Sequence, residues 1–383
     1  MAPLDVEYFK LPEGTPPLPY IRLSTWVRFL MDSKRLPRQF CGVPSYDKMH
    51  SLLGEFWSRF QQINGQHVIF QLASSGKVSL DSCIPYFSHT DEGRSYKHTP
   101  LWVMSCHGVL GRGTRSYLKT GQHKRPIKEN AMGLNYTGKT WSTQFLFSTM
   151  TKKVMEANPQ AMDGLMTIFA SDAKMLLEEG ITDKSGNYRV HLIHLGTKGD
   201  LPALRVLSGA KRSFSQVPRA ASSKKPCLGV CPLCDAGQEL NPQLGLPAIP
   251  YEDVNPTALW TTTLHTNPPW DTPPTILEGL NLSTEDSMAF FLTDPWHNLH
   301  LGVLKRFIGS SMVAIVESGA LPSLPPVRSV DKRFEWLTEL YMAYCRSQKV
   351  SPWLQEISRD TMGFPSSTVE PVGRWTKAVV STD

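Results

Sequence analysis

Apolar side chains recur at intervals of three and four residues in two long stretches of the chain. Residues 46–65 and 159–179 each carry an apolar stripe along one side, which predicts two amphipathic helices. Ser45 is suited to begin the first helix, and a glycine is placed to end each of them. A shorter stripe over 21–32 predicts another helix, so we expect residues 1–80 to form a helical N-terminal region.

Short apolar runs rich in β-branched and aromatic residues predict strands at 84–87, 101–106, 145–147 and 190–195. The first two would form a hairpin with its turn at 91–93. The chain order is then strand, strand, strand, long helix, strand, helix. This order predicts an α/β fold with a ribonuclease H-like core over 81–215, in which carboxylates from adjacent strands meet to hold divalent metal ions.

Two aspartates lie beside these predicted strands. Asp200 falls between the strand 190–195 and a short helix that Pro202 can start, a frequent position for catalytic acids in α/β folds. Asp91 lies beside the first strand, where the alternative is an acid that only forms the hairpin turn.

Composition limits the class of protein. A chain of 383 residues with 40% hydrophobic and 10% aromatic residues can fill one elaborated α/β domain or two domains. A formal charge of +6 permits a polyanionic partner without requiring one. No apolar run is long enough for a membrane span, and the N-terminus lacks a signal-peptide core, so we expect a protein that is neither membrane-bound nor secreted.

Three of the seven cysteines, Cys227, Cys231 and Cys234, lie within eight positions. A CxxC pair can bind one tetrahedral zinc ion through both sulfurs, and an odd cysteine count favours a metal in a reducing compartment over disulfides. The fourth ligand is open, with His265, His297 and His300 as candidates. The alternative is a set of ordinary reduced thiols in the Pro-rich insertion that we expect over 216–288.

The C-terminal part, residues 289–383, is expected to be helical. It opens with Asp294 and His297, three residues apart. By chemistry alone, Asp294 would cap a helix begun by Pro295, with His297 buried behind it.

The blocks GDLPALRVLSG, CxxxCxxC and DPWHNLHLGVLKRF resemble, in this order, the catalytic region of large eukaryotic DDE transposases of the CACTA and Kyakuja-Dileera-Zisupton types. The upstream SHTDEGRSYKHTPLWVMSCHGVLG is similar to their first-acid hairpin. Long multi-copy proteins of this kind in dinoflagellates also have counterparts of FWSRFQQINGQHV and GFPSSTVEPVGRWTKA. The resemblance covers about residues 56–378.

The resemblance implies that Asp91 and Asp200 are the first two acids for a pair of Mg²⁺ or Mn²⁺ ions, and that the cysteines hold a structural zinc ion. Asp294 and His297 match a "D-x-x-H" block to which we assign no role. Glu92 separates Asp91 from Gly93, where these families often have Asp-Gly. No glutamate matches a third-acid block, although three lie in helical sequence: Glu317, Glu335 and Glu339. Such proteins continue beyond the last residues of this chain, so we expect an incomplete transposase.

The implied activity is cleavage or transfer of DNA strands in the nucleus. Five basic residues could neutralise DNA phosphates near the site, or simply be solvated: Lys198, Lys211, Arg212, Lys224 and Lys225. The alternative function is a catalytically inactive zinc-knuckle module that binds DNA or a protein. A Cys106–His107 catalytic pair is disfavoured, because adjacent residues of a strand face opposite ways.

Overall fold

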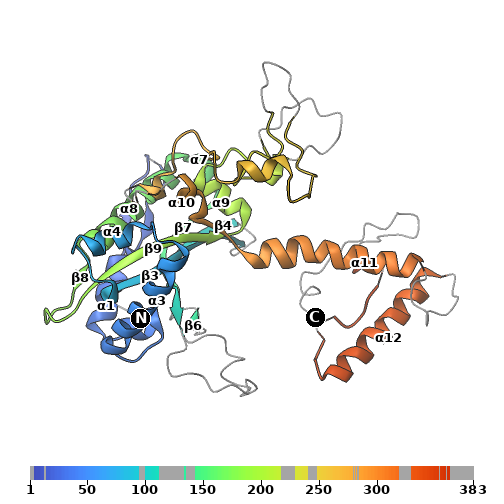
Figure 1. Cartoon of the computed structure of the whole chain (residues 1–383), viewed down its shortest axis with the longest axis horizontal. Helices are drawn as coiled ribbons and strands as arrows, with labels where there is room; N and C mark the ends of the chain where they lie inside the picture. The colour runs from blue at the N-terminus through green and yellow to red at the C-terminus, as the bar shows by residue number, and fades with distance from the viewer. Residues whose placement is uncertain are drawn as a thin grey trace. The chain divides into compact units, whose positions relative to one another are not determined.

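The computed structural model describes residues 4–12, 14–94, 100–111, 133–134, 143–216, 229–239, 248–278, 280, 282, 284–318, 329–352, 354–358 and 360–362 (Figure 1). The chain forms two compact units, Met1–Leu292 and Thr293–Asp383. Helices and strands are both present in the first unit, so the fold is mixed α/β.

A mixed sheet of eight strands forms the centre of the described fold, in the order β1-β2-β7-β4-β3-β9-β10 with β8 paired to β9. The strands are β1 (Glu7–Phe9), β2 (Leu18–Tyr20), β3 (Cys83–Arg94), β4 (Pro100–Gly108), β7 (Phe145–Thr151), β8 (Ile181–Thr182), β9 (Arg189–Gly199) and β10 (Phe291–Thr293). A separate short pair joins β5 (Leu110–Gly111) to β6 (Gly133–Leu134).

The central strands combine both kinds of pairing. β4 is antiparallel to β3 and to β7, whereas β9 is parallel to β3. A parallel pair needs a crossover, and the chain between β7 and β9 supplies it as α7 (Lys152–Ala157) and α8 (Gln160–Glu178). The long helix expected over 159–179 is therefore confirmed, and it is the connection that makes β9 parallel to β3.

The remaining helices of the first unit are α1 (Leu23–Asp32), α2 (Leu36–Cys41), α3 (Tyr46–Ile63), α4 (Val68–Ser74), α9 (Leu201–Ser208) and α10 (Thr284–Ala289). As predicted, the Ser45 side chain accepts a hydrogen bond at the start of α3, from the Lys48 N–H. α1 has no cap from its preceding residue. Instead, the buried Asp172 carboxylate of α8 accepts bonds from the Ser24 N–H (3.0 Å) and hydroxyl (2.5 Å), which joins the start of α1 to α8.

The two faces of the sheet differ in how deeply their side chains are buried. On β3, Tyr86, Ser88 and Thr90 are fully buried, while the alternating residues, including Asp91, are only partly buried. The buried face packs against α8, where the Phe169 ring contacts His194 of β9 with a centroid distance of 5.3 Å. The opposite face of β3 is thus the face on which polar residues can meet a ligand.

Two expectations about local structure were wrong. β3 continues to Arg94, so Asp91 lies inside a strand and not in a turn at 91–93. The reason is that β3 pairs on both sides, with β4 up to Arg94 and with β9 up to Thr90, and this pairing outweighs the turn preference of Asp-Glu-Gly. The N-terminal region is also not purely helical, because β1 and β2 extend the sheet beyond β7.

The described part of the second unit consists mainly of helices, followed by an irregular segment over 350–352 and 354–358. It contains a segment with π-type turns (Trp296–Leu304), α11 (Lys305–Ser318) and α12 (Val330–Gln348). Its small core consists of buried apolar side chains from α12 and the following segment: Phe334, Leu337, Leu354, Ile357 and Met362. Within the described ranges, no helix combines the length and the apolar character that crossing a bilayer requires.

Candidate functional site

Asp91 and Asp200 are brought together by the parallel pairing of β3 and β9. In this ladder Thr90 lies opposite Gly199, so the next residue on each strand is one of the two aspartates. Asp200 keeps extended backbone angles (φ −70°, ψ 159°), which continue the line of β9 by one residue. The two carboxylates therefore come from adjacent parallel strands at the same edge of the sheet.

Asp200 has a second role as the N-cap of α9. Its Oδ1 accepts a hydrogen bond from the Ala203 N–H at 2.7 Å, and Pro202 occupies the first turn. Gly209 ends the helix in the left-handed conformation (φ 62°). The cap orients the carboxylate, because one of its oxygens is fixed to the start of the helix.

Asp91, and not its neighbour Glu92, lies on the partly buried face of β3 that is opposite α8, which we call the polar face. The Glu92 carboxylate forms an ion pair with the ammonium group of Lys152 in α7, at 3.2 Å. Successive residues of a strand point to opposite faces, so Asp91 shares its face with Phe87 and His89. The extra acid between Asp91 and Gly93 thus has a partner of its own.

A lysine lies on the same face as the two aspartates. Lys198 precedes Asp200 by two residues and pairs with His89 in the β3–β9 ladder. Its Nζ lies 4.2 Å from the centroid of the Phe87 ring and 3.4 Å from Nε2 of His107, which comes from β4. Burial, and then the positive charge of Lys198, lowers the pKa of His107 to about 3, so the imidazole is neutral and can accept a bond from the ammonium group.

The sequence did not single out Phe87, and it raised His107 only to set aside a Cys106–His107 catalytic pair. Cys106 is 1% exposed, and burial raises its pKa well above the ordinary value of a thiol. It pairs with Ser88, whereas His107 pairs with Phe87, so the two residues lie on opposite faces of the sheet. The available signal was the two-residue period of a strand, which places Phe87 on the same face as His89 and Asp91.

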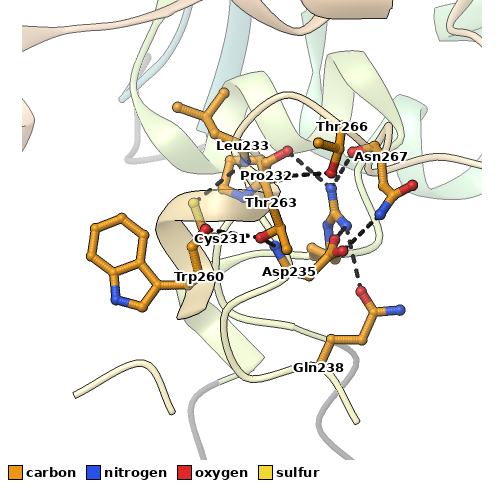
Figure 2. A network of polar contacts seen from close by, with 10 residues as sticks. Cys231, Pro232, Leu233, Asp235, Gln238, Trp260, Thr263, Thr266 and Asn267 are labelled. Carbon is orange, nitrogen blue, oxygen red and sulfur yellow. Dashed lines mark hydrogen bonds and ion pairs between the residues drawn. The ribbon is translucent and has the colours of Figure 1, made fainter. Parts of the chain in front are cut away.

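Of the other basic residues that the sequence offered as DNA contacts, the two that the structure describes each pair with an aspartate. Arg212 is 5% exposed: its guanidinium group forms an ion pair with Asp235 and donates to the carbonyl oxygens of Pro232 (3.4 Å) and Asn267 (2.5 Å) (Figure 2). Because the Arg212 guanidinium group is buried and bonded to groups of the protein itself, we do not retain Arg212 as a DNA contact. Lys211 is exposed and pairs with Asp271, and Lys224 and Lys225 lie outside the described residues.

Cys231 and Cys234 lie beside each other in a tight turn, whereas Cys227 lies outside the described residues. The Leu233 N–H donates to the Cys231 sulfur at 3.4 Å (Figure 2). Burial, and to a lesser degree the neighbouring Cys231, raises the pKa of Cys234 to about 11. Two adjacent thiols with an N–H···S bond fit half of a tetrahedral zinc site.

The histidine candidates for the fourth zinc ligand differ in position. The His265 N–H donates to the Leu233 carbonyl at 2.8 Å, and its buried Nδ1 has no hydrogen-bond partner within the described part of the chain. No three His, Cys, Asp or Glu side chains form a metal-holding group among the residues that the structure describes. The side chain of His300 is outside that set.

Asp294 and His297 interact within the second unit. The Asp294 Oδ2 lies 2.7 Å from Nδ1 of His297, and the Asp294 carbonyl accepts from the Asn298 N–H. The His297 side chain is 38% exposed, so it is not the buried histidine that the helix-cap interpretation expected. The "D-x-x-H" block is therefore a local hydrogen-bonded pair at the start of a helical segment.

Comparison with protein-family models, with curated proteins and with solved structures gives no match for this chain.

Proposed function

We propose that this chain is a DDE transposase-like protein that cleaves or transfers DNA strands with divalent metal ions, on a ribonuclease H-like core. The observation that carries the proposal is the register of β3 and β9, which makes Asp91 and Asp200 neighbours. In the central sheet, the antiparallel strands β3, β4 and β7 are followed along the chain by α7, α8 and the parallel strand β9, with Asp91 on β3 and Asp200 directly after β9, and this succession also supports the core. DNA as the partner and the nucleus as the location are parts of the same proposal.

The chemistry of the two aspartates fits this role. Carboxylate oxygens are the ligands that Mg²⁺ and Mn²⁺ prefer. Asp91 would offer its oxygens from β3, directly after the end of its pairing with β9, and Asp200 would offer the oxygen that does not cap α9. Bound ions would supply activation of the attacking water or 3′-hydroxyl and stabilisation of the leaving oxygen. The third acid stays unassigned: Glu335 and Glu339 are exposed residues of α12, and the side chain of Glu317 lies outside the described residues.

The test is nicking of supercoiled DNA by the purified chain with Mg²⁺ or Mn²⁺. Asp91→Asn and Asp200→Asn should each abolish metal-dependent nicking while the far-UV circular dichroism stays unchanged. Glu92→Gln is the matched control, because it removes an adjacent carboxylate that is already paired with Lys152. Nicking that survives both aspartate substitutions, or that Glu92→Gln abolishes equally, would refute the assignment.

A second candidate function is a zinc-knuckle module that binds DNA or protein and cuts nothing. The N–H···S bond to Cys231 beside the second thiol favours it. Elemental analysis should find about one zinc ion per chain, lost in Cys234→Ser and retained in Cys345→Ala, which removes a cysteine buried in the second unit. Bound zinc without any nicking would select this module, and zinc-free protein would exclude it.

A further inference from the structure

The ammonium group of Lys198 is held at a defined place on the sheet. A lysine side chain normally samples many rotamers, and its charge is well hydrated. Here the ammonium group lies over the Phe87 ring at 4.2 Å and within 3.4 Å of His107 Nε2. These two contacts come from β3 and β4, while Lys198 itself comes from β9, so three adjacent strands determine its position.

His107 is suited to hold a cation because it is neutral. Burial lowers its pKa to about 3, so at neutral pH one ring nitrogen carries a proton and the other accepts. The ammonium group can only donate, which assigns Nε2 as the acceptor and Nδ1 as the protonated nitrogen. That buried Nδ1 has no hydrogen-bond partner among the described residues. Lys198 is therefore the group to which Nε2 of the imidazole is bonded, and the His107 ring also contacts the Phe87 ring, at a centroid distance of 6.1 Å.

The Lys198 ammonium group lies close in the β-ladder to the two aspartates, which indicates what it can bind. Lys198 lies opposite His89 in the ladder, two residues before Asp200, and Asp91 follows His89 by two residues on the same face. A polyanionic strand that approaches two carboxylates meets repulsion, which a fixed positive charge on the same face offsets.

We propose that Lys198, positioned by Phe87 and His107, contacts a backbone phosphate of the nucleic acid strand bound at the Asp91–Asp200 edge. This inference rests on the proposed function and deepens it, because it names the group that binds the substrate phosphate. His107 and Phe87 are positioning residues, which act through the lysine.

The test measures binding of a short fluorescent DNA duplex without added Mg²⁺, over a range of salt concentrations. Loss of one phosphate contact should reduce the slope of log Kobs against log[salt] by about 0.9. We expect Lys198→Met to show this reduced slope and severalfold weaker binding. Lys184→Met is the matched control, because it removes an exposed lysine that pairs with Asp32 away from this face.

The role of His107 is tested through a double-substitution cycle. His107→Leu should weaken binding in the wild-type background and have no further effect when Lys198 is already methionine. His107→Gln should restore binding, because its side-chain oxygen can accept from the ammonium group. An unchanged salt slope in Lys198→Met, an equal effect of His107→Leu in both backgrounds, or a wild-type chain that does not bind DNA would each overturn the proposal.

The outcome is separable from that of the proposed function. Nicking that survives Asp91→Asn would refute the metal-dependent mechanism and leave the phosphate contact standing. Loss of nicking in Asp91→Asn with an unchanged salt slope in Lys198→Met would refute the phosphate contact alone.

Discussion

Thr90 of β3 lies directly opposite Gly199 of β9, and this pair sets how closely the two parallel strands approach. A Cβ atom placed on Gly199 would lie 2.7 Å from the Thr90 carbonyl oxygen and 3.0 Å from its Cγ2. Asp91 and Asp200 follow these two residues directly. The spacing of the two carboxylates therefore depends on the absence of a side chain at position 199.

Replacing Gly199 by alanine should lower stability and activity together. The new methyl group must displace a backbone oxygen, which we expect to cost about 1–3 kcal/mol of unfolding free energy. Any nicking should fall with it, because β9 carries Asp200. Urea denaturation and the nicking assay measure the two effects. Gly93→Ala, where a Cβ would meet nothing within 4 Å, should change stability by less than about 0.5 kcal/mol. Equal stability of the two variants would contradict this account.

Two substitutions of Asp200 should separate its structural role from its chemical role. Asparagine retains an oxygen that can accept the bond from the Ala203 N–H, so Asp200→Asn should leave the stability nearly unchanged. Asp200→Ala removes the cap and should cost about 1 kcal/mol in urea denaturation. Both variants should lack metal-dependent nicking, because neither provides a carboxylate. Full activity in the asparagine variant would show that Asp200 is only a helix cap.

The sequence predicted those parts of the fold that depend on local patterns. Helical periodicity and glycine stops located α3 and α8, and the Asp-Leu-Pro sequence located the start of α9. The extent of β3 could not be predicted in this way, because it is set by pairing with β4 and β9, whose residues are distant in the sequence. Likewise, the two-residue alternation indicates which side chains share a face of a strand, but not which strands lie side by side.

The same distinction applies to the candidate site. The motif around Asp200 singled out that residue, and the hairpin suggested Asp91. The Lys198–His107 contact joins residues 91 positions apart, which no local pattern indicates. Charge alone made Arg212 a DNA-binding candidate, but whether an arginine is buried depends on its partner, here Asp235, 23 positions away.

The Arg212–Asp235 ion pair should be important for the stability of the cysteine-containing insertion. Its side chains are 6% and 14% exposed, so Arg212→Ala leaves a largely buried carboxylate without its charged partner and with the Asn267 side-chain amide as a donor. We expect a loss of about 3–5 kcal/mol in unfolding free energy, and faster proteolysis within 229–278. Arg212→Lys should rescue little, because an ammonium group cannot reproduce the planar contacts with Asp235, Pro232 and Asn267.

The control is Lys211→Ala, which removes an exposed pair with Asp271 and should cost no more than about 1 kcal/mol. If Arg212→Ala were as stable as this control, the guanidinium group would be accessible to solvent. Its role as a DNA contact would then have to be considered again.

His194 should make the protein less stable in mild acid. Its ring stacks on Tyr86 at a centroid distance of 4.7 Å and contacts the Ser88 hydroxyl at 3.0 Å on the buried face of the sheet. Burial lowers its pKa from 6.5 to about 3, so between these pH values the unfolded chain binds a proton that the folded chain does not. The contribution of His194 to stability is therefore fully present above pH 6.5 and is lost as the pH falls toward 3.

At about 1.4 kcal/mol per pH unit, and with the unfolded imidazole already half-protonated at pH 6.5, this residue alone should lower the unfolding free energy by about 2 kcal/mol between pH 6.5 and 4.5. His194→Gln cannot take up this proton, so its stability should fall less steeply over the same interval, whatever its stability at pH 7. Ser88→Ala, which leaves the buried imidazole in place, should retain the steep dependence. Urea denaturation at several pH values measures all three proteins, and parallel curves for wild type and His194→Gln would show that the folded protein protonates His194 freely.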